Sequence, residues 1–343
     1  MNRSGEPLEL VVSAGDPQGV GPEVAVKAVR IVSAAEPGVQ FVLVGDRAVW
    51  RASLADPAWP SIRSDEAPTA PVSILEVSTG DAFADPPPSS AGGRAARASL
   101  DAALARVRAL PARRALVTAP LSKEAVRMAG DRTFDGHTGY IAARCGTARP
   151  IMLFAAPGFR VALATVHVAL RRVSEIVTAD YLARFLRILA FELRRRYGIP
   201  SPRIDVLGLN PHAGEGGAFG DEEHTALIPA IRSLQAAGES VAGPFPADSY
   251  FLEGFAGRAD CAVAMYHDQG LVAVKSLAFK EAVNVTLGLP LIRTSPDHGT
   301  AFGIAGKDAA DPAPMAAALR EAVRLLRAVV LGRESEIPPE AGV

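Results

Sequence analysis

Three histidines, each at the end of an apolar strand-like segment, are the side chains of this sequence best suited to chemistry. They are His167, His212 and His267, which follow the segments 160–166, 204–209 and 261–265. None has the i, i+4 partner typical of a metal site on a helix. The spacing therefore leaves two interpretations open. The histidines could be polar residues that end strands, or three imidazoles that converge on Zn²⁺, Co²⁺ or a similar ion with an open coordination position.

A second group of polar residues could bind an anion. Lys275, Asn284 and Arg293 are spaced widely, each within apolar sequence. Two cations supply charge and one amide supplies orientation, which is what a phosphorylated or carboxylated substrate requires. Lys123, at the start of a predicted helix over 123–128, could be catalytic or could simply cap a solvated helix.

The elements that would position these residues alternate between strand and helix. The apolar pattern predicts a strand over 8–13, a helix to about residue 35 that begins near Pro22, and a strand over 39–44. This order indicates parallel pairing in an α/β fold, in which functional groups lie beyond the carboxyl ends of strands. Thr178 is a predicted N-cap, Gly198 is predicted to end that helix, and a last helix is predicted over 313–331.

Composition narrows the function classes. The chain has 343 residues, enough for about two domains, and a formal net charge of −1, which argues against nucleic acid or an anionic membrane as partner. Its two cysteines, Cys145 and Cys261, lie far apart, so we expect neither a disulfide nor a cysteine-based zinc site. The first residues lack the apolar core of a signal peptide, and we expect a cytoplasmic protein.

Motifs along the chain resemble the 4-hydroxythreonine-4-phosphate dehydrogenases of pyridoxal phosphate biosynthesis. In chain order they are GDPQGVGPE, TAPLSK, GHT, NPHAGEGG, MYHDQGL, FKEAVNVTLGLP, IRTS and DHGTA. The segment HGTAFGIAGKDAADP is also similar to the adenine-binding loop of isopropylmalate and isocitrate dehydrogenases.

The resemblance implies an isocitrate/isopropylmalate dehydrogenase-like fold, with two α/β/α domains, a cleft between them and no classical Rossmann domain. We expect one domain to comprise 1–132 and 295–343 and to carry the NAD-binding loop. The other, 133–294, would carry most metal and substrate ligands. The family also forms homodimers with sites completed by both subunits, and we expect the same here.

The resemblance further implies NAD-dependent, divalent-metal-dependent oxidation of 4-phosphooxy-L-threonine to a 3-keto acid that decarboxylates to 3-amino-2-oxopropyl phosphate. The metal, Zn²⁺, Co²⁺ or Mg²⁺, would be bound by His167, His212 and His267. Lys123 and Asp248 are candidates for the general base. The implied substrate ligands are His137, Thr138, Lys275, Asn284 and Arg293, and the implied NAD ligands are His298, Gly299 and Thr300.

Two departures from the family pattern keep alternatives open. Gly139 stands where the family usually has an acidic residue, so a paralogous dehydrogenase of a phosphorylated aldonate or an aromatic cis-dihydrodiol carboxylate is an alternative. Phe302 and Gly303 stand where this loop often has an acidic residue, so NAD over NADP follows from the family alone. A zinc hydrolase and a non-catalytic phosphometabolite-binding protein fit less well, because neither needs an adenine pocket.

Overall fold

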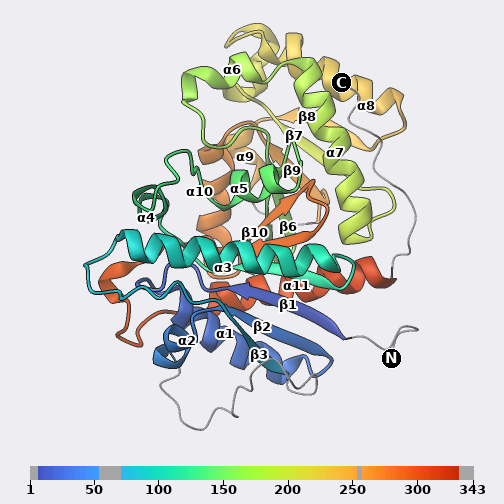
Figure 1. The fold of residues 1–343 in the computed structure, drawn as a ribbon. Coiled ribbons are helices and arrows are strands. Elements are labelled where there is room, and N and C mark those ends of the chain that lie inside the picture. The colour runs from blue at the N-terminus through green and yellow to red at the C-terminus, as the bar shows by residue number, and fades with distance from the viewer. Residues whose placement is uncertain (1–6, 54–70, 253–256, 332–343) are drawn as a thin grey trace. The chain divides into compact units, whose positions relative to one another are not determined.

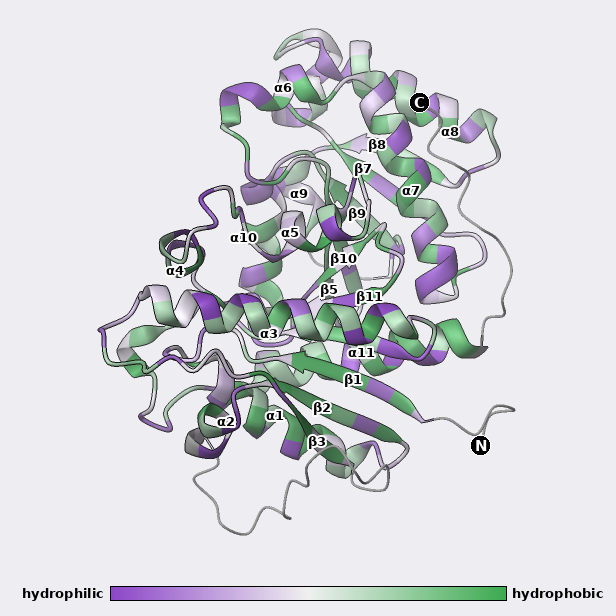
Figure 2. Cartoon of the chain, viewed as in Figure 1, coloured by the Kyte–Doolittle hydropathy of each residue, from purple (hydrophilic) through white to green (hydrophobic). Residues whose placement is uncertain are grey.

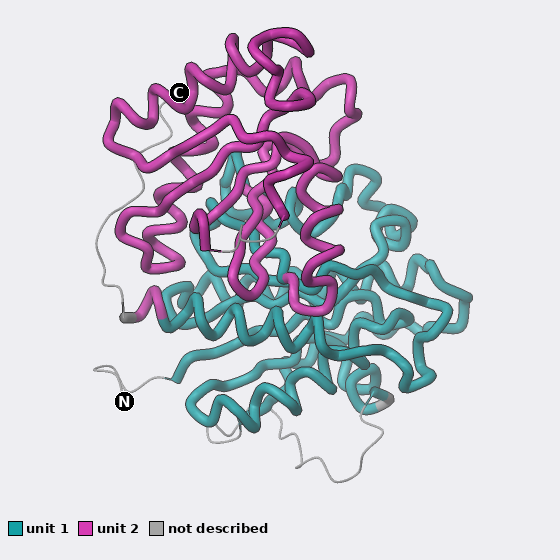
Figure 3. The backbone as a smooth tube through the Cα atoms, turned by 180° about the vertical axis from the view of Figure 1, so that it is seen from behind, with its two compact units in different colours: residues 1–150, 283–327 teal, residues 151–282, 328–343 magenta. Residues whose placement is uncertain are grey.

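The computed structural model describes residues 7–53, 71–252 and 257–331, and the chain divides into two compact units (Figure 3). Unit 1 comprises Met1–Pro150 and Val283–Arg327, and unit 2 comprises Ile151–Ala282 and Ala328–Val343. The chain therefore leaves unit 1 after residue 150, returns to it at residue 283 and leaves it again after residue 327. The unit boundaries fall at 150 and 282, compared with 132 and 294 in the expectation from sequence.

Unit 1 is built on a mostly parallel sheet with the strand order β3-β2-β1-β4-β11-β10, of which β1, β2 and β3 are seen side by side in Figure 1. Only β10 runs antiparallel, along β11. The strands are β1 (Leu8–Ser13), β2 (Val39–Gly45), β3 (Val72–Glu76), β4 (Arg114–Thr118), β10 (Val283–Leu287) and β11 (Ile292–Ser295). Figure 2 shows hydrophobic residues along most of β1 and β2, as expected for strands buried between layers.

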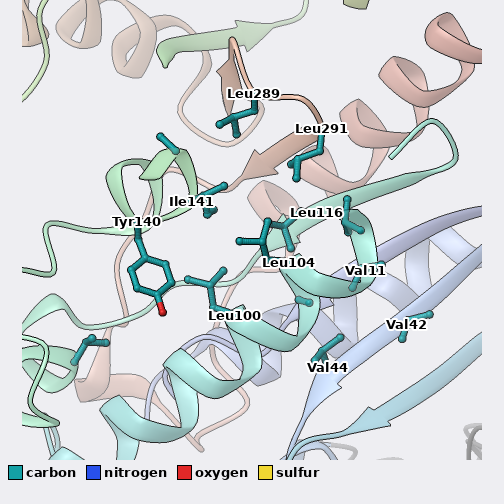
Figure 4. Close-up of a cluster of buried hydrophobic side chains, with 14 of the residues drawn as sticks. Val11, Val42, Val44, Leu100, Leu104, Leu116, Tyr140, Ile141, Leu289 and Leu291 are labelled. Atoms are coloured by element: carbon teal, nitrogen blue, oxygen red, sulfur yellow. The ribbon is translucent and has the colours of Figure 1, made fainter. Parts of the chain in front are cut away.

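Helix α3 supplies most of the hydrophobic core on one face of this sheet. Its Leu100 and Leu104 pack in one cluster with Val11 of β1 and Leu116 of β4 (Figure 4). The same cluster takes in Ile141, so α5 belongs to unit 1. The helices of unit 1 are α1 (Gly21–Ala35), α2 (Arg47–Ser53), α3 (Ser90–Ala109), α4 (Lys123–Met128), α5 (His137–Arg144), the 3-10 turn η4 (Phe302–Ile304) and α11 (Ala313–Leu331), which belongs to unit 1 as far as Arg327.

Unit 2 has the strand order β5-β6-β9-β7-β8, in which β5 and β6 are antiparallel and the other neighbours are parallel. The strands are β5 (Ile151–Ala156), β6 (Phe159–Leu163), β7 (Ile204–Leu207), β8 (Val241–Phe245) and β9 (Cys261–Ala264). The helices are α6 (Val173–Ile176), α7 (Ala179–Tyr197), α8 (Ile228–Ala236), α9 (Ala247–Tyr250) and α10 (His267–Ala278), with the short turns η1 (Leu170–Arg172), η2 (Pro211–Gly217) and η3 (Glu223–Leu227).

Several sequence-based element predictions are confirmed. Strand 8–13, helix 123–128 and helix 313–331 have the predicted bounds. The Thr178 side chain caps α7 by accepting a hydrogen bond from the Tyr181 backbone N–H, and Gly198 ends the helix with φ 65°. Among the described residues, no helix is both long enough and apolar enough to cross a bilayer.

Other element predictions were wrong. The predicted strand over 160–166 ends at Leu163, and the polar stretch after Met265 begins helix α10. Residues 134–138 lead into helix α5, and residues 243–248 contain the end of β8 and the start of α9. These segments are short and polar, and their regular structure depends on packing against distant segments, which local propensity does not report.

Candidate functional site

Arg293 is a buried cation on β11, between β4 and β10 of the unit 1 sheet. It lies on β11 with 3% of its surface exposed, and its guanidinium donates to the hydroxyls of Thr286 on β10 (3.1 Å) and Thr118 on β4 (2.7 Å). Among the described residues no carboxylate forms an ion pair with it, and burial lowers its pKa to about 10. A buried charge held only by hydroxyls favours binding of an external anion.

Strand register explains why this part of the sheet is polar. Arg293 is paired with Leu116, and Asn284 is paired with Ser295. Because directly paired residues and residues two apart share one face, Asn284, Thr286, Thr118 and Arg293 all lie on the same face. Oδ1 of Asn284 and Nε of Arg293 are buried, and neither finds a hydrogen-bond partner within the described chain.

His137 extends this polar site from the first turn of α5. The residue is half-buried, but its Nε2 atom is fully buried and lacks a partner in the described part of the chain. Burial lowers the pKa of His137 well below 6.5, and the positive charges of Arg293 and Lys123 lower it further. Lys123 packs beside it, with Cε 2.9 Å from the position that a Cβ on Gly136 would take. His137 and Arg293 thus have buried nitrogen atoms without a partner in the described part of unit 1, and these nitrogens suit an anion, whereas the unpaired Oδ1 of Asn284 is an acceptor and its amide N–H₂ is the group that suits an anion.

The depressed pKa of His137 predicts a pH dependence of stability. As pH falls below 6.5, His137 gains a proton in the unfolded state but stays neutral in the folded state. The free energy of unfolding therefore decreases as pH falls below 6.5. The limiting slope is about 1.4 kcal/mol of unfolding free energy per pH unit until the folded pKa is reached. Urea unfolding between pH 7.5 and 5 is expected to show this loss in the wild type and a shallower one in His137→Asn. Equal slopes in the two proteins would contradict it.

The departure at Gly139 has a structural counterpart. A Cβ at position 139, the third residue of α5, would overlap the Asp135 carboxylate, whose Oδ2 lies 2.3 Å from that Cβ position. A carboxylate therefore lies next to this glycine even though the residue itself has none. Sequence reasoning missed Asp135, because proximity between residues 135 and 139 depends on the Gly136 backbone, with φ 126°.

The three predicted metal ligands follow three adjacent parallel strands of unit 2. His167 follows β6, His267 begins α10 after β9, and His212 follows β7, in the spatial order β6-β9-β7. Side-chain contacts tie these strand ends together. Gln269 donates to the Gly208 carbonyl (2.7 Å) and accepts from the Met265 backbone N–H (2.6 Å). The carboxyl ends of parallel strands thus bring together residues that are 100 positions apart in sequence.

The structure brings two of these histidines into contact. The rings of His167 and His267 have centroids 5.8 Å apart, and Nδ1 of His267 lies 2.7 Å from Oδ1 of Asp268. A carboxylate on one ring nitrogen orients the other nitrogen toward a ligand. Among the described residues, no three His, Cys, Asp or Glu side chains come close enough together to hold a metal. His212 is exposed, and its ring lies 6.1 Å from that of Phe219.

His212 lies in a loop of strained backbone. Residues 212–216 all have positive φ, and three of them, His212, Ala213 and Glu215, are not glycine. The left-handed region costs about 1–2 kcal/mol for each such residue. Strain of this kind persists only where surrounding contacts fix the backbone, and it clusters at functional sites.

The remaining predicted residues of unit 2 lie on its surface. Asp248 is exposed on α9, directly after β8, which neighbours β7. Lys275 is exposed in the last turn of α10, whereas Asn284 and Arg293 belong to unit 1. Thr138 is the second residue of α5 and is half-buried.

The predicted cofactor loop borders a pocket within unit 1. The carbonyl of Thr300 accepts a hydrogen bond from the Val20 backbone N–H (2.8 Å), and a Cβ on Gly19 would lie 2.8 Å from the same oxygen. Only glycine therefore allows the GDPQGVGPE turn to approach this loop so closely. Nε2 of His298 is buried and, within the described residues, unpaired.

The adjoining pocket has a volume of about 540 Å³ and several acidic side chains. Its lining includes Gly19, Glu23, Asp46, Phe83 and Gly306. Oε2 of Glu23 is buried and has no partner among the described residues. Asp46 accepts hydrogen bonds from the Ala48 backbone and the Ser78 hydroxyl. The pocket suits a polyhydroxylated ligand more than a highly charged anion.

Sequence reasoning missed the residues that support these side chains. Thr118 and Thr286 orient Arg293, Asp268 contacts His267, and Glu223 contacts the loop that carries His212. Thr118 and Asp268 lie within recognised motifs, so inspection of motif neighbours could have suggested them. The contact of Thr286 with Arg293 could be recognised only once the pairing of β10 with β11 was known.

Comparison with known proteins supplies a family. The model of the family described as "Pyridoxal phosphate biosynthetic protein PdxA" matches residues 38–322. A 4-hydroxythreonine-4-phosphate dehydrogenase from Burkholderia vietnamiensis is 43% identical over 326 residues, which cover 93% of this chain and 97% of the relative.

Solved structures of proteins with the same family name are similar to this chain. The crystal structure of 4-hydroxythreonine-4-phosphate dehydrogenase from Klebsiella pneumoniae aligns with a TM-score of 0.80 and 35% identity over 93% of this chain and 99% of that one. A terephthalate 1,2-cis-dihydrodiol dehydrogenase from Burkholderia xenovorans aligns with a TM-score of 0.64 and 32% identity over 95% and 99% of the two chains. A beta-decarboxylating dehydrogenase from Thermococcus kodakarensis, at 14% identity and a TM-score of 0.51 over 94% and 87%, shares the fold alone. The expected isocitrate dehydrogenase-like fold is thereby confirmed.

Proposed function

Because this chain belongs to the family of the pyridoxal phosphate biosynthetic protein PdxA, we propose that it is a 4-hydroxythreonine-4-phosphate dehydrogenase. It oxidises the C3 hydroxyl of 4-phosphooxy-L-threonine with NAD and a divalent metal ion. The resulting 3-keto acid loses CO₂ to give 3-amino-2-oxopropyl phosphate.

The observation that carries the proposal is the buried Arg293 with its unpaired Nε. A phosphate oxygen that accepts from Nε would supply the counter-charge that the described residues do not. Asn284 and His137 then orient the phosphate, and Thr138 and Lys275 complete the proposed set of substrate ligands. Binding energy gathered at the phosphate, away from the reacting carbon, aligns the C3–H bond for transfer.

The residues of unit 1 fit a dinucleotide cofactor. We propose that His298, Gly299 and Thr300 hold the adenosine half, with the adjoining pocket lined by Glu23 and Asp46 taking its ribose. The orphan Oε2 of Glu23 supports this placement, because a ribose hydroxyl would give it a donor. Carboxylates in the lining would repel a 2′-phosphate, which favours NAD over NADP. When bound, NAD accepts the hydride.

The donor set of unit 2 fits a divalent cation such as Zn²⁺, Co²⁺ or Mg²⁺. The 5.8 Å between the rings of His167 and His267 suits two imidazoles beside one ion, since Zn–N bonds are about 2.0–2.1 Å long. We propose that His212 is the third ligand. The metal supplies Lewis-acid polarisation of the substrate hydroxyl. Lys123 and Asp248 are the proposed proton acceptors, and the pH profile of kcat in Lys123→Met and Asp248→Asn distinguishes them.

A related dehydrogenase activity is the second candidate. Gly139, together with the similarity to the terephthalate 1,2-cis-dihydrodiol dehydrogenase, favours an aromatic cis-dihydrodiol carboxylate as the alternative substrate. NADH formation at 340 nm, measured with Zn²⁺ or Mg²⁺ present, compares this substrate with 4-phosphooxy-L-threonine and a phosphorylated aldonate. We expect 4-phosphooxy-L-threonine to have the highest kcat/KM, with NAD preferred over NADP. A higher kcat/KM for the dihydrodiol would reject the first proposal.

We also propose that the enzyme is a homodimer. Helix α10 and the residue after it expose large apolar side chains, with Val272 67% exposed, Leu277 51% and Phe279 60%. Val272 and Phe279, seven residues apart, lie on one side of the helix, and an exposed apolar patch is typical of a protein interface. Sedimentation velocity that yields a monomer of 35.8 kDa at micromolar concentration would reject the dimer.

A further inference from the structure

The loop that carries His212 is hydrogen-bonded at its start to one buried carboxylate, that of Glu223. Glu223 is 1% exposed and begins the η3 turn, which follows η2 in the chain. Its Oε1 accepts hydrogen bonds from the backbone N–H groups of Leu209 and Asn210, both at 2.8 Å, and its Oε2 accepts from Nδ2 of Asn210 at 2.9 Å. One side chain therefore fixes the residues at which the strained segment begins.

The same carboxylate also limits the middle of the loop. A Cβ on Gly214 would lie 2.7 Å from Oε2 of Glu223, and Gly214 has φ 79°. The left-handed turn thus closes directly on the carboxylate, with room only for glycine at this position. Contacts at residues 209, 210 and 214 bracket His212 on both sides.

The backbone around Glu223 is itself unusual. Residues Glu223–Leu227 form a single turn of π-helix ahead of α8, and Ala226 and Leu227 in this turn are buried. A π-turn is rare and is frequently found at functional sites. Here it presents the Glu223 carboxylate to the loop.

We propose that Glu223 is a positioning residue that sets the location of His212 for metal binding. The proposal rests on the function proposed above, in which His212 is a metal ligand. Glu223 itself is not a ligand, because its two oxygens accept three hydrogen bonds from Leu209 and Asn210. Its role is to hold the left-handed turn in a single conformation, so that the imidazole does not have to be ordered when the metal binds.

The test is Zn²⁺ binding by calorimetry to the full-length, metal-free protein. In Glu223→Gln the amide N–H₂ faces either the two backbone N–H donors or Nδ2 of Asn210, so at least one of the three hydrogen bonds is lost together with the negative charge, and the anchor of the loop is weakened. We expect the Kd for Zn²⁺ to rise about 10–100-fold, the range seen when support of a metal ligand is removed. Glu222→Gln is the matched control, because Glu222 is half-buried and its single hydrogen bond within the described residues is with Nδ2 of Asn210, at 2.7 Å. We expect the Kd of this variant to stay within about twofold of wild type, because Glu222 bonds to no backbone N–H of the loop and a half-exposed contact contributes little.

A double-mutant cycle separates positioning from general destabilisation. If Glu223 acts through His212, Glu223→Gln should have almost no further effect on Zn²⁺ affinity in a His212→Ala background. A full additional loss in that background would overturn the proposal. Gly214→Ala provides a second route if Glu223→Gln folds poorly. It leaves Glu223 in place, and its Cβ displaces the same turn, so we expect a similar loss of affinity.

The single variant His212→Ala distinguishes failure of the proposed metal site from failure of the proposed positioning role of Glu223. If it weakens Zn²⁺ binding while Glu223→Gln and Gly214→Ala bind as wild type, the positioning role is wrong and the metal site stands. If His212→Ala binds Zn²⁺ as wild type, the metal site is wrong and the positioning role falls with it. Amide exchange at Leu209 and Asn210 is expected to accelerate in Glu223→Gln, and unchanged exchange would also overturn the proposal.

Discussion

Replacing Arg293 by methionine is expected to lower kcat/KM for the phosphorylated substrate by about 10³-fold. Truncating one partner of a buried, hydrogen-bonded charge pair costs about 2–5 kcal/mol, and about 4 kcal/mol corresponds to three orders of magnitude. Both KM and kcat should suffer, because the phosphate anchor also orients the reacting carbon. Steady-state kinetics with 4-phosphooxy-L-threonine and NAD measure both constants.

The free protein should tolerate this substitution. Arg293 has only hydroxyl partners in the described residues, so methionine removes a buried charge that lacks a counter-ion. We expect the free energy of unfolding to stay within about 1 kcal/mol of wild type or to rise, because apolar replacement of buried charge is often neutral or stabilising.

Arg196 provides the matched control. It is equally buried, at 3% exposed, but its Nε lies 3.3 Å from Oε2 of Glu192, itself 3% exposed. Arg196→Met leaves the buried Glu192 carboxylate with Arg195 as its remaining ion-pair partner, at 3.5 Å, and is expected to cost up to about 3–5 kcal/mol of stability with kcat/KM unchanged. If Arg293→Met kept its rate and lost stability as Arg196→Met does, Arg293 would be a structural residue and not an anion anchor.

Replacing His267 by alanine is expected to remove the metal and about 10³-fold of kcat. Loss of one imidazole from a three-ligand site weakens metal binding, and Lewis-acid assistance contributes several kcal/mol to such an oxidation. Metal content after dialysis, measured by atomic absorption, should fall from about one ion per chain to well under half. Chelation of the wild type should give the same loss of rate, and added Zn²⁺ should restore it.

His224 serves as control for this substitution. It is exposed on the η3 turn of the same unit and has no assigned role. His224→Ala should retain metal and rate. A His267→Ala protein that retained full metal content and turnover would reject the three-histidine site, whatever the behaviour of His224→Ala.

Much of the local structure could be predicted from the sequence alone. The apolar runs set strands such as 8–13, and the Thr178 cap with Gly198 set the bounds of α7. These signals are local, because a strand or helix buries a face whose period is written in neighbouring residues. The apolar segments also predicted histidines after three strands, and these strands are neighbours in the order β6-β9-β7.

The tertiary structure alone decided which polar atoms remain unsatisfied and what holds them. Arg293 is surrounded by Thr118 and Thr286 because strands that are remote in sequence pair in one register. The left-handed turn at His212 depends on Glu223, a contact that no local pattern encodes. Register and strain are set by packing between distant segments, and for that reason the sequence determined the types of the functional residues while the fold determined their charge state and support.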